Sequence, residues 1–303
     1  MAFPRAQIRL KRRQPALPLR FFAAVFETRL IENENLVVAV PPVKMEVITG
    51  PAYMYRLSNN RAVVPLKGEI NEEVEIPSPS AIDFEEGKRY IIVSTRIQGD
   101  PGIVEEECRQ SIERMVGIVG VLTSPTLFAL PVYVGWASAS PETPIDTIAM
   151  FSKPMKLHRP ALEKGVSVAR KVLANDSVMR ARFDLIARLF NRAIGSPATE
   201  EAFLWAWMCL EVFPMMGTQK HSHIAPHLAK LTGEEEGVLA RRLDIRGLYG
   251  LRSKLVHSGY LGLPESELFS RITTLRGIVH TVMRGMCGLP YDGELERVLR
   301  VGN

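Results

Sequence analysis

The spacing of hydrophobic positions changes near the middle of this chain. Between residues 19 and 98, short runs rich in β-branched and aromatic side chains alternate with turn sequences, a pattern typical of strands. The predicted strands are residues 36–40, 46–49, 52–57, 61–65 and 89–97. Residues 72–80 combine carboxylates with two prolines and are predicted to be an exposed edge or loop.

One helix and further strands complete the first half. Apolar positions at helical spacing over residues 103–121, after an acidic first turn, predict a helix. Residues 126–137 predict one or two strands. No charged residue occurs from 115 to 140, which is long enough to cross a bilayer. Because Pro125 and Pro131 interrupt this stretch, we expect no membrane span.

Beyond a segment rich in Pro and Ser at residues 138–160, the hydrophobic period becomes that of helices. Helices are predicted at residues 160–174, 178–194, 197–213, from the capping box at 232–235 to about 246, within 248–259, and at 264–286. Ser196-Pro197 is expected to start the third helix, and Thr232 to open a capping box. The third helix is apolar on every side, as in the buried centre of a bundle. Arg276 and His280 are read as a surface pair.

These patterns predict an α+β protein of two domains. Residues 1–152 are expected to form a β-rich mixed domain of unassigned role, and residues 153–303 an all-α helical domain. The length of 303 residues suits two domains. The first part carries 16 basic and 18 acidic residues, and the second carries 22 and 15. The positive excess therefore lies in the helical half, where it indicates either a phosphate-binding surface or an ordinary basic surface of solvated helices.

The cysteines and the N-terminus bear on location. Cys108, Cys209 and Cys287 are far apart in the sequence, which indicates reduced thiols rather than a disulfide framework. The apolar run at residues 21–26 is too short for a signal peptide. A cytoplasmic protein is expected.

The candidate chemistry is concentrated in residues 248–259, which read LYGLRSKLVHSG. At 100° per residue, a helix here places its leucines on one stripe, with Arg252 at the border of the stripe. Tyr249 and Ser253 lie further round, and His257 lies roughly opposite the core. A histidine in that position is either an idle surface residue or one offered to a partner or ligand.

This string closely resembles the signature of the HEPN superfamily, and in particular of its ApeA-like branch. The hallmark there is LY-x-LRS-x-(I/V)VH-G; in this chain a serine intervenes between His257 and Gly259, a departure that leaves the arginine and the histidine in place. The branch also carries an apolar helix ending in Leu-Glu about forty residues upstream, matched here by Leu210-Glu211. The resemblance covers roughly residues 176–288 and leaves the first half unassigned.

Glu211 has two readings from the residues alone. A carboxylate at the end of an apolar helix must be paired, hydrogen-bonded or at the edge of a site. It is therefore either the ion-pair partner of a neighbouring arginine or a functional group. The two readings merge if the arginine is Arg252.

The resemblance implies a HEPN-like helical bundle that cleaves RNA without a metal ion. Arg252, His257 and Glu211 would be catalytic, with Ser253 and Tyr249 in support. The substrate's 2′-hydroxyl would attack, and the product would be a 2′,3′-cyclic phosphate. The basic side chains expected to bind RNA are Lys254, Arg246, Arg242, Arg188 and Arg192.

The resemblance also implies partners. They are an RNA substrate, with tRNA among the candidates, a homodimer through the helical domain, and an inhibitory partner protein if the chain is the toxin of a toxin–antitoxin or phage-defence system. The alternative is a non-catalytic module for RNA binding or dimerisation. No cofactor is expected. His221, His223 and His227 lack companion ligands at metal-binding spacing, so no metal is expected either.

Overall fold

A computed structural model describes residues 21–29, 31, 36–49, 55–57, 61–65, 71–75, 88–96, 101–128, 130–137, 157–195, 199–218 and 220–301. Five strands form an antiparallel sheet in the order β2-β3-β7-β1-β8. Their bounds are β1 Phe21–Thr28, β2 Val37–Val40, β3 Val43–Thr49, β7 Arg89–Arg96 and β8 Leu130–Ala137. A separate three-stranded sheet contains β4 Tyr55–Leu57, β5 Arg61–Pro65 and β6 Asn71–Glu75.

Strand β1 pairs with both β7 and β8, yet it was not among the predicted strands. Phe22, Ala24 and Phe26 belong to the main hydrophobic cluster, and the alternate residues Ala23 and Val25 are buried as well. A strand buried on both faces shows no alternation of polar and apolar residues, so periodicity does not reveal it. The strands that were predicted agree with β2 to β5, β7 and β8 to within a few residues. Strand β6, which overlaps the segment predicted as an edge or loop, is an edge strand of the three-stranded sheet.

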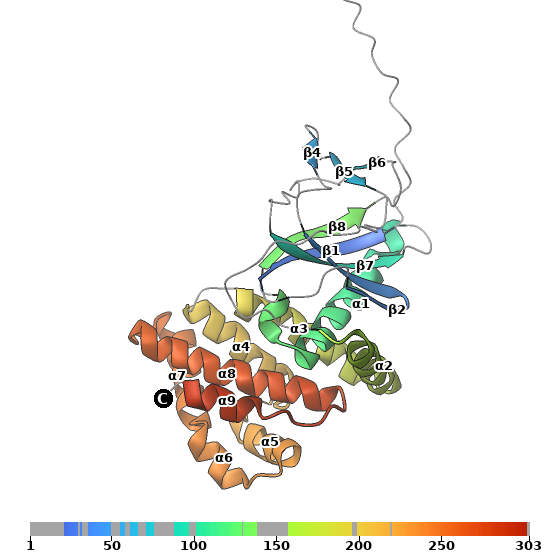
Figure 1. Cartoon of the computed structure of the whole chain (residues 1–303). Helices are drawn as coiled ribbons and strands as arrows, with labels where there is room; N and C mark the ends of the chain where they lie inside the picture. The colour runs from blue at the N-terminus through green and yellow to red at the C-terminus, as the bar shows by residue number, and fades with distance from the viewer. Residues whose placement is uncertain are drawn as a thin grey trace, which may run out of the picture.

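Helix α1 (Pro101–Leu122) lies between the sheet and the other helices (Figure 1). It contacts β1, β3 and β7 on one side and α2, α3 and α8 on the other. Gly117 permits the close approach of α3, because a Cβ atom there would lie 2.9 Å from the Cβ of Ala187. Arg114 Nη2 also bonds Asp184 Oδ2 of α3 at 2.6 Å. The helix thus joins the two halves of the chain.

The second half is helical, as predicted, and the fold class is α+β. The helices are α2 Arg159–Asn175, α3 Ser177–Gly195, α4 Glu200–Val212, α5 Ile224–Thr232, α6 Glu236–Arg242, α7 Ile245–Ser258, α8 Glu265–Met286 and α9 Glu294–Val301. Short 3₁₀ turns occur at η1 (Pro125–Phe128) and η2 (His221–His223). Helix α9 was not predicted.

Two predicted helix starts are wrong. Helix α4 begins at Glu200, where the side chain of Thr199 accepts a hydrogen bond from the amide of Ala202, rather than at Ser196-Pro197. Thr232 ends α5 instead of opening α6, because Gly233 adopts a left-handed conformation and caps α5. In both places another residue that can cap or end a helix lies within three positions of the predicted one. These residues are Thr199, which follows Ser196, and Gly233, which follows Thr232.

The expected surface pair on α8 is also wrong. His280 is only 2% exposed, and its Nε2 lies 3.1 Å from Asp292 Oδ2 in the segment before α9. Arg276 donates to the backbone carbonyl of Ala193 in α3. Both side chains are internal because α3 and the α9 segment cover the face of α8 that the sequence alone leaves open.

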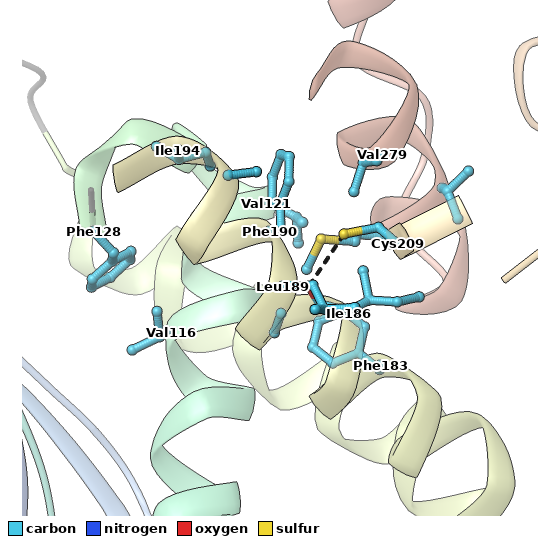
Figure 2. Packing of buried hydrophobic residues seen from close by; sticks show 14 of the residues in the cluster. Val116, Val121, Phe128, Phe183, Ile186, Leu189, Phe190, Ile194, Cys209 and Val279 are labelled. Carbon is cyan, nitrogen blue, oxygen red and sulfur yellow. Dashed lines mark hydrogen bonds between the residues drawn. The ribbon is translucent and has the colours of Figure 1, made fainter. Parts of the chain in front are cut away.

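A single hydrophobic cluster runs from the sheet through α1 into the helices. Figure 2 shows Val116 and Phe128 on one side of the view, and Ile186, Phe183 and Cys209 on the other, where a dashed line joins Cys209 to Ile186. The Cys209 thiol lies 3.7 Å from the carbonyl oxygen of Ile186. All three cysteines are buried and free.

The predicted boundary at residues 152 and 153 falls in residues 138–156, outside the described part of the chain. The parts on either side of it share the cluster just described. Within the described residues, no helix combines the length and apolar character needed to cross a membrane.

Candidate functional site

Helix α7 is fixed at both ends by its own sequence. Asp244 adopts a left-handed backbone conformation, and its Oδ1 accepts a hydrogen bond from the amide of Gly247 at 3.1 Å. At the other end Gly259 has φ of 72°, and its amide donates to the carbonyl of Leu255 at 2.8 Å. These caps define the orientation of every side chain between them.

Arg252 and Glu211 form an ion pair that joins α7 to α4. The Nε and Nη2 atoms of Arg252 each lie 2.8 Å from Glu211 Oε1. The indole N–H of Trp207, one turn earlier on α4, donates to the same oxygen at 3.0 Å. The Arg252 and Glu211 side chains are 19% and 26% exposed, so the pair lies at the edge of the core. The arginine that pairs with Glu211 is therefore Arg252, so the ion-pair interpretation and the functional interpretation of Glu211 concern the same contact.

Aromatic rings support this pair. Tyr249 stacks on His221 with ring centroids 4.4 Å apart and planes inclined by 22°. On its other side, the Tyr249 ring lies 6.0 Å from that of Trp207. Sequence reasoning missed Trp207 and His221; the position of Trp207 four residues before Glu211 is the signal that could have revealed the first.

His257 lies on the exposed side of α7, as the helical angle predicts. Its neighbours Val256 and Tyr260 are 50% and 64% exposed. The loop after α7 is anchored to α4, since the amide of Leu261 donates to Glu200 Oε1 at 2.7 Å. Ser253 is half-buried. His257 is thus presented on a well-anchored helix beside apolar surface.

The five predicted RNA-binding side chains lie on three helices, α3, α6 and α7. Lys254 and Arg246 are exposed on α7, and the Lys254 ammonium donates to the carbonyl of Leu261. Arg242 is bonded to Glu234 at 2.7 Å. Arg188 and Arg192 lie on α3 and line a cavity against the sheet.

The three histidines do not converge on a metal site. In the part of the chain that is described, no cluster of three or more His, Cys, Asp or Glu side chains is arranged to hold a metal ion. His221 stacks on Tyr249, and His227 packs edge-on against Phe213 at 4.8 Å. Burial, followed by the charge of Lys230, lowers the pKa of His227.

Comparisons with known proteins add no assignment. No family model matches the chain, and neither curated proteins nor solved structures yield a match. The site is therefore interpreted from its own residues.

Proposed function

We propose that this protein is a metal-independent endoribonuclease of HEPN type, with Arg252 and His257 as its reacting residues. The observation that carries the proposal is the contact between Glu211 and Arg252. These residues lie 41 positions apart, and each belongs to one of the two segments of the sequence resemblance. If either segment resembled the family by chance, there would be no reason for Glu211 and Arg252 to be in contact.

The chemistry needs few groups because RNA contains its own nucleophile. A base with a pKa near neutrality must take the proton of the 2′-hydroxyl, and histidine meets this requirement. A fixed positive charge must stabilise the phosphate as negative charge develops. Arg252 uses one edge of its guanidinium for Glu211, and a guanidinium has five N–H donors, so the opposite edge can bind phosphate.

Two copies of the chain supply a complete site in this proposal. Arg252 and His257 are separated by roughly 140° around one helix and do not converge on a single phosphate. A two-fold dimer through α7 would align two such pairs along one cleft, and the exposed Val256 and Tyr260 support contact at this surface. Arg246 and Lys254 would bind the RNA backbone. Only monomers in light scattering at micromolar concentration, with RNA present, would contradict this.

The decisive experiment is RNA cleavage by purified protein in excess EDTA. We expect cleavage to a 2′,3′-cyclic phosphate and no cleavage when the scissile nucleotide has a 2′-deoxy sugar. His257→Ala should lower the rate by at least ~10²-fold, the usual scale for one such group. His158→Ala, at an exposed histidine before α2, is the matched control and should cleave normally. Cleavage that needs magnesium, or that survives in H257A, refutes the mechanism.

A second experiment tests Glu211. Its role is to orient Arg252, so Glu211→Gln should reduce the cleavage rate while the thermal transition stays nearly in place. The amide keeps the shape and one acceptor oxygen for Trp207 but loses the charge. Activity that is unchanged per folded molecule, together with lower thermal stability, would leave Glu211 as a structural ion-pair partner with no part in cleavage.

The cellular role we propose is that of a toxin or phage-defence effector in the cytoplasm, held in check by a partner protein. The buried free thiols suit a reducing compartment. Expression of the wild-type chain should slow growth, whereas the H257A chain should be tolerated at equal abundance. Equal growth of cells that express the wild-type chain and cells that express the H257A chain would contradict the proposed role as a toxin or defence effector.

A further inference from the structure

A cavity of about 410 Å³ lies between β1, α1, α3 and α4, away from the Glu211–Arg252 pair. Its volume falls within the range of about 300–1,000 Å³ found for small-molecule sites. The floor is made by buried apolar side chains from the sheet, α1 and η1. These are Phe22, Phe26, Ile112, Val116 and Phe128.

Three guanidinium groups surround this floor. The Cζ atoms of Arg109 and Arg192 lie 5.2 Å from the ring centroids of Phe22 and Trp205, respectively. The third group belongs to Arg188 on α3. A guanidinium that lies over a ring keeps N–H donors for other partners, and Arg109 uses one of its donors on Glu105 Oε1 at 2.9 Å. The cavity therefore combines an apolar floor with positive charge.

The polar cluster of the cavity is incomplete. Glu113 Oε2 and Arg188 Nε lie 3.4 Å apart, and both atoms are buried without a hydrogen-bond partner among the described residues. Buried polar atoms are rarely left in this state, because the loss of hydration is then uncompensated. Burial raises the pKa of Glu113 to about 7, although the charges of Arg188 and Arg109 oppose the rise. The carboxyl group is thus only partly ionised near neutrality and offsets only part of the arginine charge.

We propose that this cavity binds a small organic anion with a compact apolar body, either an aromatic ring or a short acyl chain. The body occupies the floor formed by Phe22, Phe26 and Phe128. The carboxylate or phosphate of the ligand meets Arg188 and Arg192 and completes the hydrogen bonds that Arg188 lacks. A bare inorganic anion would leave the floor empty, and a neutral hydrocarbon would leave the arginines unpaired.

This site is separate from the proposed nuclease site. Trp205 lines the cavity, whereas Trp207 bonds Glu211, and residues two positions apart on a helix point in roughly opposite directions. Helix α4 thus stands between the two. Ligand binding here does not depend on whether RNA is cleaved.

The test is calorimetric titration of the full chain with decanoate, adenosine monophosphate, inorganic phosphate and decanol. We expect decanoate or adenosine monophosphate to bind at least about tenfold more tightly than phosphate or decanol. Arg192→Ala should weaken that binding by about tenfold or more, the scale of a hydrogen bond to a charged group. Arg180→Ala removes the same charge from an exposed position on α3 and should leave the affinity unchanged.

A preference for decanoate would identify an acyl ligand, and a preference for the nucleotide an aromatic one; both support the proposal. A second variant, Asn191→Trp, places a large side chain at the rim of the cavity and should abolish binding. The proposal is overturned if no probe binds, if phosphate or decanol binds equally well, or if R192A and R180A behave alike.

Discussion

Two glutamate–arginine pairs, each between two helices, show how geometry distinguishes a complete polar cluster from an incomplete one. Glu211 of α4 accepts an N–H bond from Arg252 Nε of α7 at 2.8 Å, forms an ion pair with Arg252 Nη2 at the same distance, and accepts a second bond from Trp207. Glu113 of α1 and Arg188 of α3 approach only to 3.4 Å and leave buried atoms unbonded. The residue types are the same, and the hydrogen bonds differ.

The difference has an energetic meaning. Hydrogen bonds from several donors replace the hydration that a carboxylate loses on burial. A carboxylate without them takes up a proton more readily, as Glu113 does with a pKa of about 7. The first pair is thus a finished structural unit that orients Arg252, and the second requires an additional group.

The largest effect on folding should follow Glu211→Ala. This change leaves the Arg252 guanidinium, only 19% exposed, without its carboxylate, and also removes the acceptor of the Trp207 N–H. We expect the free energy of unfolding to fall by about 3 kcal/mol, the lower end of the range for breaking a buried pair. Urea unfolding checks this value. A loss below that of Glu113→Ala would reverse the comparison of the two pairs.

Glu113→Gln should have a smaller effect that depends on pH. Because the pKa of Glu113 is raised from 4.5 to about 7 in the folded state, its contribution to stability is present below pH 4.5 and is lost as pH rises through 7. The variant should therefore match the wild type at pH 4.5 and exceed it by about 2 kcal/mol at pH 8, given the 1.36 kcal/mol that accompanies each pKa unit and partial screening.

The comparison of variant with wild type isolates Glu113 from the other groups that titrate. The charges facing it come from Arg109 and Glu106 on α1 and from Arg188 and Asp184 on α3, and all four are kept in the variant. A difference that is flat from pH 4.5 to 8 would show that folding does not raise the pKa of this carboxyl group.

The fold was largely predictable from sequence where periodicity is strong. Inward residues of α3 such as Phe183 and Ile186, and of α8 such as Ile272, are buried as predicted. The sequence failed where burial is two-sided, as in β1, or where distant segments meet, as at His280 and Asp292. Such contacts depend on the arrangement of whole helices, which local patterns do not contain.

The candidate site was predictable only in part. Helical angles place Arg252 beside the core and His257 outside, as the structure does. The contact of Glu211 with Arg252 could be inferred, because an end-of-helix carboxylate needs a partner. The cavity could not be predicted from the sequence. Its arginines come from α1 and α3 and its floor includes β1 and η1, and its lining residues are spread over some 180 positions of the chain.

Removing the ring that supports the first pair should cost less than breaking the pair. His221→Ala eliminates the stack on Tyr249 and should lower the free energy of unfolding by about 1 kcal/mol. His223→Ala, at a half-buried histidine two residues away on the same 3₁₀ turn, is the matched control. Equal losses in the two variants, measured by urea unfolding, would mean that the stack contributes nothing specific.

The smallest effect should come from Arg192→Ala in the cavity. This side chain is exposed and is held by its contact with the Trp205 ring, so its removal should lower the free energy of unfolding by about 0.5 kcal/mol, the value of an exposed cation–π contact. Arg252→Ala should cost several times more, because Arg252 makes a hydrogen bond and an ion pair with Glu211. An arginine held this weakly can turn toward an anion with little loss of stability, which a ligand site requires. If thermal unfolding shows R192A to be as destabilised as R252A, then Arg192 has a structural role like that of Arg252, and the contrast between the two sites disappears.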